Sequence, residues 1–593
     1  MTQKKVSFWR IFWPSLVSGI VLTIIFLMIF TSVIGSLFSA KPVYVVEDKT
    51  VLYLELNTEI AEMSKSEISF GSMGMVNHIG LADLLYGFEK AAKDDRVKGI
   101  FIELKGANCG YATATEIRNA IKKFEKESGK FVVAYHSGEA IGLKQYYIAS
   151  AASENYGFHS SMFEFLGLGA ELMFYKGLFD KLDLEMQVVR GSNNDFKSAV
   201  EPYFLTEASD SSRLQLETYL NNIWTAIKSN ISEDKDISIE ELELIADSSL
   251  VRRVQQAVKH KLIDEVKYRD EIIQLIADKV GLKNADDLNL KGFEKYAQKK
   301  FEDNQNIAHS KKADVAVIVA EGAVVVDGEG LASNKITKLL REARKDKDIK
   351  TIVFRINSPG GSALASDEIW REVKLANEQK KVIVSMGDVA ASGGYYIAAP
   401  AAKIFAQETT ITGSIGVFGV IPYTGAMLEN KLGLTFDRIS TNKHAIISTN
   451  RKMSPKEYSI IQNEVDFIYT EFLQRVADGR GMTTEQVNRV ARGRVWTGND
   501  ALRIGLVDTL GGIQDAIAYA AKEAGIENPV IRYYPKVKKE IWLDIIEAIS
   551  EDDDNNKLEG SSIPQEMMHM YKKIKQIEQL TGVQARLPYE IIW

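Results

Sequence analysis

The sequence predicts an α/β protein with two tandem domains that follow one transmembrane helix. An uncharged, apolar segment near the amino terminus predicts the helix. A set of short segments that occurs twice, about 250 residues apart, predicts the two domains. Within each copy β-branched runs alternate with helical segments, which is typical of mostly parallel sheets covered by helices.

The length and composition are those of a globular protein with more than one core. At 593 residues the chain exceeds one ordinary hydrophobic core. The net charge of -7 gives no support for nucleic-acid binding. A single cysteine, Cys109, excludes an intramolecular disulfide framework and a multi-cysteine metal site, and the histidines contain no His-Glu-x-x-His pair. We therefore expect no metal and no cofactor.

Residues 11–38 are predicted to form a transmembrane anchor. The stretch 11–40 carries no charge and exceeds the roughly 20 residues that cross a bilayer. A basic cluster precedes it and only Lys41 follows closely, which favours a cytoplasmic tip over residues 1–10 and a body across the membrane. A cleaved signal peptide is the alternative, because residues 36–40 end in small side chains. The apolar stretch is, however, about twice as long as a usual signal core.

The rest of the chain contains two related halves. Residues 51–56 and 315–320 both have the pattern of a strand, and similar segments follow in the same order in each half. The matching pairs are 93–100 with 345–352, 145–149 with 394–398, and 262–264 with 506–508. Helical segments at 83–92 and 335–344 complete the alternation. Two α/β domains follow from this duplication.

The boundary between the halves falls in a polar stretch. Residues 291–312 are dense in Lys, Gln, Asn and Asp, which is typical of a solvated connection. The repeat ends near Asp508, and the acidic run 551–556 indicates an exposed loop. The predicted organisation is a first repeat over residues 45–285, a linker over 286–312, a second repeat over 313–530 and a C-terminal extension over 531–593.

Ser392 lies where a predicted strand gives way to a helix. The β-branched run 381–385 precedes it and two glycines follow it. A helix N-cap serine is the structural alternative. In the aligned first copy the position is Leu143, so the fold itself does not require a serine there. The loop Asn357-Ser-Pro-Gly-Gly-Ser362 likewise contains an adjacent glycine pair that the first copy lacks.

The asymmetry also runs in the other direction, at Lys197. This residue, in Asp195-Phe-Lys-Ser-Ala-Val-Glu-Pro202, falls opposite Ile446 or Ile447 of the second copy. Apolar residues at the aligned site indicate that Lys197 lies at least partly inside. A serine hydroxyl needs a base to become a nucleophile, and a lysine amine can serve if burial lowers its pKa. One half therefore keeps a candidate nucleophile and the other a candidate base.

Serine hydrolysis also needs donors for the oxyanion of the tetrahedral intermediate. Backbone N–H groups of glycine-rich loops suit this task, and those of Gly361 and Gly393 are the candidates. Ser414, in Ile411-Thr-Gly-Ser-Ile-Gly416, has a hydroxyl that could orient the lysine amine. A simple turn serine in a glycine-rich loop is the alternative for Ser414.

These motifs resemble the membrane-anchored signal peptide peptidase A enzymes, also called protease IV, of the long two-domain type. The matching segments are 196–202, 357–362, 387–395 and 412–419. The resemblance implies two crotonase/Clp-protease-like domains and a Ser/Lys-dyad endopeptidase. It implies Ser392 as the nucleophile, Lys197 as the general base and Ser414 as a third hydroxyl. It further implies a homotetramer in the bacterial inner membrane, with its body on the extracytoplasmic side, that degrades cleaved signal peptides.

Two other functions remain open on the sequence. Crotonase-type acyl-CoA hydratases and thioesterases also use paired backbone amides, so the fold alone does not decide the chemistry. A non-catalytic membrane scaffold is favoured if Lys197 lies far from Ser392. The residues also leave open whether these two meet within one subunit or across an interface.

Overall fold

A computed structural model describes residues 12, 13, 16, 18, 44–69, 74–310, 312–536 and 582–586. Val46–Ser66, Asn77–Lys536 and the described residues of Pro564–Trp593 form one compact unit. The predicted anchor over 11–38 falls almost wholly outside the described residues. Among those that are described, no helix combines the length and the apolar character needed to cross a bilayer.

The first sheet is parallel throughout and belongs to the first repeat. In spatial order its strands are β10 (Glu265–Val266), β7 (Glu154–Gly157), β5 (Phe131–His136), β4 (Val97–Leu104), β1 (Thr50–Leu56) and β11 (Leu290–Gly292). The central strands are rich in Val, Ile and Phe and nearly all their residues are buried, as expected for a parallel sheet covered on both faces.

The second repeat builds a sheet with the same layout. Its corresponding strands, in spatial order, are β22 (Thr509–Leu510), β18 (Lys403–Ala406), β17 (Val382–Ala391), β15 (Thr351–Ser358), β12 (Val315–Glu321) and β23 (Ile531–Tyr534), all parallel. Strand β17 runs on past its counterpart and pairs with β19 (Ile411–Gly413), which pairs with β21 (Val495–Thr497). The two strand orders are therefore the same, which confirms the predicted pair of mostly parallel α/β sheets.

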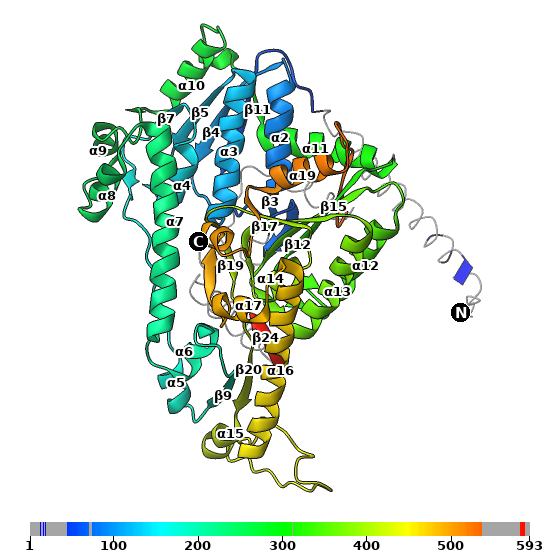
Figure 1. Ribbon diagram of the computed structural model, residues 1–593. Coiled ribbons are helices and arrows are strands. Elements are labelled where there is room, and N and C mark those ends of the chain that lie inside the picture. The colour runs from blue at the N-terminus through cyan, green and yellow to red at the C-terminus, as the bar shows by residue number, and fades with distance from the viewer. Residues whose placement is uncertain are drawn as a thin grey trace, which may run out of the picture. The chain divides into compact units, whose positions relative to one another are not determined.

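The helices also fall into two series, one in each copy of the repeat. The first copy has α2 (Leu81–Lys93), α3 (Tyr111–Ser128), α4 (Leu143–Ala149), α5 (Lys176–Lys181), α6 (Glu201–Phe204), α7 (Asp210–Lys235), α8 (Ile239–Asp247), α9 (Val254–Lys259) and α10 (Arg269–Lys279). The second has α12 (Ser333–Lys345), α13 (Ala363–Gln379), α14 (Gly393–Ala398), α15 (Gly425–Leu432), α16 (Pro455–Arg480), α17 (Thr484–Val490), α18 (Gly498–Arg503) and α19 (Ile513–Glu523). Helices α2 and α3 lie side by side (Figure 1), as α12 and α13 do.

A third sheet brings together segments from both halves and from the C-terminal extension. Its strands, in spatial order, are β14 (Leu331–Ala332), β13 (Val324–Val325), β16 (Gly360–Ser362), β24 (Gly582–Arg586), β20 (Phe418–Tyr423) and β9 (Glu185–Arg190). Strand β24 is antiparallel to both of its neighbours. Two smaller pairs are β2 (Lys65–Ser69) with β3 (Gly74–His78) and β6 (Ala140–Ile141) with β8 (Met162–Phe163).

The predicted solvated linker over residues 286–312 is a helix for most of its length. Helix α11 (Phe293–Ser310) buries Phe293, Tyr296 and Phe301 on one face and packs against α2 and β23. Its polar residues cover the outer face, so its composition hides an amphipathic helix. The segment is thus part of the packed body, which corrects the expectation of a solvated connection.

Candidate active site

Ser392 occupies the junction between β17 and α14, as predicted. Every residue of β17 is buried, and the helix begins at Gly393. Ser392 has φ 55° and ψ -113°, a backbone conformation that costs a non-glycine residue about 1–3 kcal/mol and is found mainly at functional sites. Its hydroxyl makes no N-cap hydrogen bond to the helix. Ser392 therefore holds the N-cap position of α14, but its side chain does not cap the helix.

Lys197 is held in a short loop between β9 and a 3-10 turn (Ser198–Val200). Its N–H donates to the Asn194 carbonyl at 3.1 Å. Gly493 packs directly on its backbone, because a Cβ at Gly493 would lie 2.6 Å from the Lys197 nitrogen. Gln215, on α7, donates to the Phe196 carbonyl at 3.1 Å and accepts from the backbone N–H of Val495. The lysine loop is thus clamped from two sides.

The Lys197 amine and the Ser392 hydroxyl meet inside a single chain. Nζ lies 2.8 Å from Ser392 Oγ, 2.9 Å from the Ser414 carbonyl oxygen and 3.0 Å from Ser414 Oγ. All three side chains are fully buried. The Ser392–Lys197 pair can therefore form within one subunit.

The three oxygens around Nζ satisfy the amine in either protonation state. A neutral amine has two N–H donors, which bond the carbonyl and the hydroxyl oxygen of Ser414, and one lone pair. That lone pair remains for the Ser392 O–H to donate to. A protonated ammonium has three donors and no lone pair, and would need the Ser392 oxygen as an acceptor. The geometry therefore suits transfer of the Ser392 proton to Nζ.

Burial also favours the neutral form of Lys197. Loss of water around the ammonium lowers the pKa of the Lys197 amine well below its usual range. The hydrogen-bond partners of Nζ are hydroxyl and carbonyl oxygens, which offset this loss less than a carboxylate would.

Ser414 sits on a strained turn that aims both of its oxygens at Nζ. It has φ 49°, its N–H donates to the Arg494 carbonyl at 2.7 Å, and the preceding Gly413 carbonyl accepts from the Ser392 N–H at 2.8 Å. The turn therefore contacts both the backbone of Ser392 and the amine of Lys197, so Ser414 does more than a simple turn serine would.

The predicted oxyanion donors come from two abutting segments. Gly393 opens α14, and Gly361 lies in β16. The end of β15, just before β16, packs closely against the helix, because a Cβ at Gly394 would lie 2.6 Å from the Ser358 carbonyl oxygen. Gly361 pairs with Val324 on one side and with Ala585 of β24 on the other. An extended segment therefore lies along the edge that carries Gly361.

Lys197 is buried for a different reason from the one that the sequence indicated. The residues aligned with it, Ile446 and Ile447, lie in a loop, and Ile447 is 48% exposed. The loop of Lys197 is instead held in place by Gly493, which packs on its backbone, and by Gln215, which bonds the Phe196 carbonyl; the sequence did not single out either residue. The one available signal was the glycine between two arginines at 492–494, and it is weak by itself.

A buried serine hydroxyl that faces a buried lysine amine, on an α/β scaffold, is the arrangement of a serine hydrolase with a lysine base. The model of peptidase family S49 matches residues 124–283 and 374–527. That of Clp protease matches residues 313–413. The chain thus belongs to peptidase family S49 and is a serine peptidase. Its tandem organisation and its Clp-protease-like domain are also confirmed.

Several relatives are similar over most of the chain. Serine protease SPPA, chloroplastic, of Arabidopsis thaliana is 33% identical over 82% of this chain and 71% of its own length. Protease 4 of Salmonella typhi is 32% identical over 82% of this chain and 80% of its own. Protease 4 of Haemophilus influenzae is 31% identical over 74% and 72%. Family membership selects the peptidase over the acyl-CoA and scaffold alternatives.

Proposed function

We propose that this serine peptidase is a membrane-anchored endopeptidase in which Ser392 is the nucleophile and Lys197 the general base. The observation that carries the proposal is the 2.8 Å contact between Lys197 Nζ and Ser392 Oγ, both fully buried. Ser414 orients the amine through the two acceptors that it presents to Nζ.

In the first half-reaction Ser392 Oγ attacks the carbonyl carbon of the scissile bond, and its proton passes to Nζ. The resulting ammonium gives that proton to the leaving amine, which departs and leaves an acyl-enzyme on Ser392. In the second half-reaction a water molecule attacks the ester and passes a proton to Nζ. Collapse of that intermediate returns the proton to Oγ. Backbone N–H groups of Gly361 and Gly393 stabilise the oxyanion in both halves.

The substrate is an extended polypeptide. Support comes from β24, whose backbone lies antiparallel between β16 and β20, with Ala585 opposite Gly361 and Gln584 opposite Phe418. The sheet at this place accepts a polypeptide main chain by strand addition, a common mode of peptide recognition. A substrate strand there would run past Gly361, one of the two proposed oxyanion donors.

Cleaved signal peptides are the proposed natural substrates. A relative from Enterococcus faecium, 37% identical over 198 residues, is named putative signal peptide peptidase SppA. The apolar segment 11–38 would hold the enzyme in the bacterial inner membrane, near such apolar peptides. The body would lie on the extracytoplasmic side, and the active assembly would be a homotetramer.

The test is cleavage by full-length protein in detergent of an unstructured protein and of a leucine-rich peptide. Ser392→Ala and Lys197→Met should each lose at least about 1,000-fold in kcat. Ser366→Ala is the matched control, because Ser366 is also fully buried in the second repeat and donates to the Ser362 carbonyl, away from Nζ. Cleavage at the normal rate by either of the first two variants would rule out the proposed pair.

A further inference from the structure

Strand β17, which ends at Ser392, is attached to the first repeat through Asp388. The Asp388 carboxylate accepts from the backbone N–H of Gly110 at 3.1 Å and of Thr113 at 2.8 Å. It also accepts from the Thr113 hydroxyl at 2.7 Å. These donors form the amino-terminal end of α3, whose N-cap residue is a glycine without a capping side chain. Asp388 therefore caps a helix of the other repeat.

The approach of the two segments is too close for any residue but glycine at position 110. A Cβ on Gly110 would lie 2.1 Å from Asp388 Cγ. Asp388 is 7% exposed, so the hydrogen bonds of its carboxylate are largely shielded from water, where charge-assisted bonds are strong and directional. The position of α3 is thus fixed relative to a residue four places before the nucleophile.

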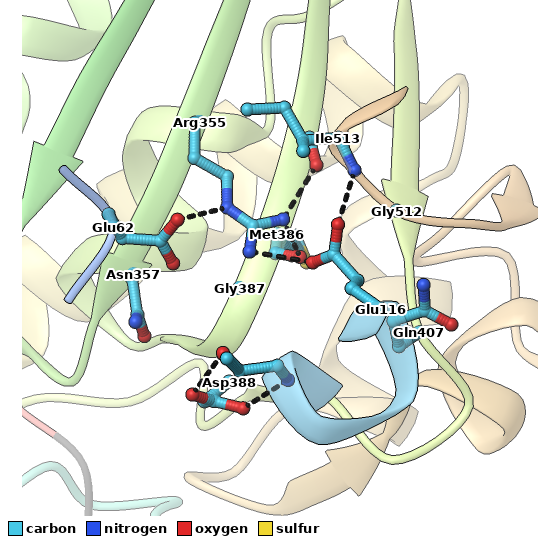
Figure 2. A network of polar contacts seen from close by, with 12 residues as sticks. Glu62, Glu116, Arg355, Asn357, Met386, Gly387, Asp388, Gln407, Gly512 and Ile513 are labelled. Atoms are coloured by element: carbon cyan, nitrogen blue, oxygen red, sulfur yellow. Dashed lines mark hydrogen bonds and ion pairs between the residues drawn. The ribbon is translucent and has the colours of Figure 1, made fainter. Parts of the chain in front are cut away.

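A second attachment of β17 is made through Arg355, which lies on the neighbouring strand β15 (Figure 2). The Arg355 guanidinium pairs with Glu62 Oε2 at 2.8 Å and with Glu116 Oε1 at 2.7 Å, and both glutamates come from the first repeat. Its Nη1 donates to Ser385 Oγ and to the Met386 carbonyl of β17. Glu116 also accepts from the backbone N–H of Ile513, the first residue of α19. The cluster joins α3, β15, β17 and α19.

Buried charge clusters of this kind contribute little net stability, because desolvation offsets their attraction, but they fix one geometry. The reaction needs such precision, since Lys197 and Ser392 come from different halves of the chain and must meet at hydrogen-bond distance. A misplacement of about 1 Å costs roughly 100-fold in rate. The contacts of Asp388 and Arg355 with the first repeat hold β17 just before Ser392, the residue that has to be placed.

We propose that Asp388, together with Thr113, is a positioning pair that registers β17 against the first repeat and so sets Ser392 opposite Lys197. Arg355 and its two glutamates hold the same strand nearer its start. The inference rests on the proposed roles of Ser392 and Lys197. It adds residues that touch neither substrate nor reacting atoms.

Helix α3 offers a matched pair of variants. Thr113 and Thr115 are 3% and 4% exposed. The Thr113 hydroxyl faces Asp388, whereas that of Thr115 bonds the Tyr111 carbonyl and the Tyr147 hydroxyl within the first repeat. Thr113→Val and Thr115→Val each delete one buried hydroxyl from the same helix. Only the first of these weakens the attachment of β17.

The measurements are kcat, KM and melting temperature of the full-length protein, and the rate at which a phosphonyl fluoride modifies Ser392. Thr113→Val should lower kcat and the modification rate about tenfold with KM nearly unchanged. Thr113→Ser should restore both. Thr115→Val should lower the melting temperature about as much as Thr113→Val does, but leave kcat at the wild-type value. Asp388→Asn, which replaces an acceptor oxygen by an N–H donor, should lose about 100-fold.

Equal kcat values for the two valine variants would overturn the positioning role, as would a folded Asp388→Asn protein with normal kcat. If Asp388→Asn fails to fold, the valine pair still decides. Failure of the proposed function looks different, because Ser392→Ala would then keep its activity. Loss of activity in Ser392→Ala with no difference between the valine variants would refute only the positioning role.

Discussion

Replacing Lys197 by methionine should change how the free energy of unfolding depends on pH. In the folded protein the amine is fully buried and its pKa lies well below the ordinary value of 10.5. In the unfolded chain it is exposed and titrates near that value. Between the two pKa values the unfolded state holds one proton more than the folded state. The contribution of Lys197 to the free energy of unfolding is therefore fully present above pH 10.5 and is lost as the pH falls toward the pKa of the amine in the folded protein.

The size of the effect follows from one proton. Within the window the free energy of unfolding of the wild type rises by about 1.4 kcal/mol for each pH unit through Lys197 alone. Methionine has a similar length and no proton to bind. The stability difference, wild type minus Lys197→Met, should thus increase by about 1.4 kcal/mol per pH unit toward alkaline pH. Other titrating groups cancel in this difference.

The assay is urea unfolding of both proteins at several pH values between neutrality and pH 10. Ser366→Ala serves as the control, because Ser366 is also fully buried and its hydroxyl does not titrate in this range, so its removal should leave the slope unchanged. Parallel pH dependences for the wild type and Lys197→Met would mean that folded Lys197 keeps its proton. That result would refute the reasoning that makes it a base.

Further expectations concern the groups around the site. Cleavage should fall about tenfold per pH unit below the pKa of Lys197 as the amine gains its proton, and a rate that is flat through acid pH would contradict this. Ser414→Ala removes one of two acceptors at Nζ, so kcat should fall about tenfold; an unchanged kcat would deny Ser414 its role. Gly493→Ala would bring a Cβ to 2.6 Å from the Lys197 nitrogen and should abolish activity. Gly129→Ala is the control, because Gly129 has a similar positive φ but open space around it, and this variant should lose only about 1–2 kcal/mol of stability. Equal activity of Gly493→Ala and Gly129→Ala would show that Gly493 does not hold the Lys197 loop in place. Truncation before Gly582 should lower KM by freeing the edge of β16, and an unaltered KM would show that β24 does not compete with substrate.

The duplication made much of the fold predictable. Strand periodicity and repeated motifs are local signals, and each copy confirms the other. The alignment of Ser392 with Leu143 is one residue out of step with the helices, because Ser392 precedes the first residue of α14 whereas Leu143 is the first residue of α4. By helix position the counterpart of Ser392 is Gly142, so both copies have a small residue at this junction.

Long-range packing accounts for what the sequence did not reveal. The loop that carries Lys197 is held by Gly493 and, through Gln215, by Val495, and these two partners lie nearly 300 residues from it along the chain. Alignment with Ile447 missed this, since that loop takes a different path and is exposed. Helix α11 carries its apolar residues among many charges, so composition concealed its periodicity. Strand β24 pairs with partners more than a hundred residues away, for which no local signal exists.

The division of the pair between the two halves of the chain has a consequence for the life of the protein. During synthesis the first repeat is made with its lysine long before β17 exists. With the proposed roles of Ser392 and Lys197, a serine on an incomplete chain, or on one whose repeats have separated, would have no base and would remain an ordinary alcohol. Hydrolytic power would then appear only when both halves have folded and docked, so that damaged or unfinished molecules could not digest their neighbours.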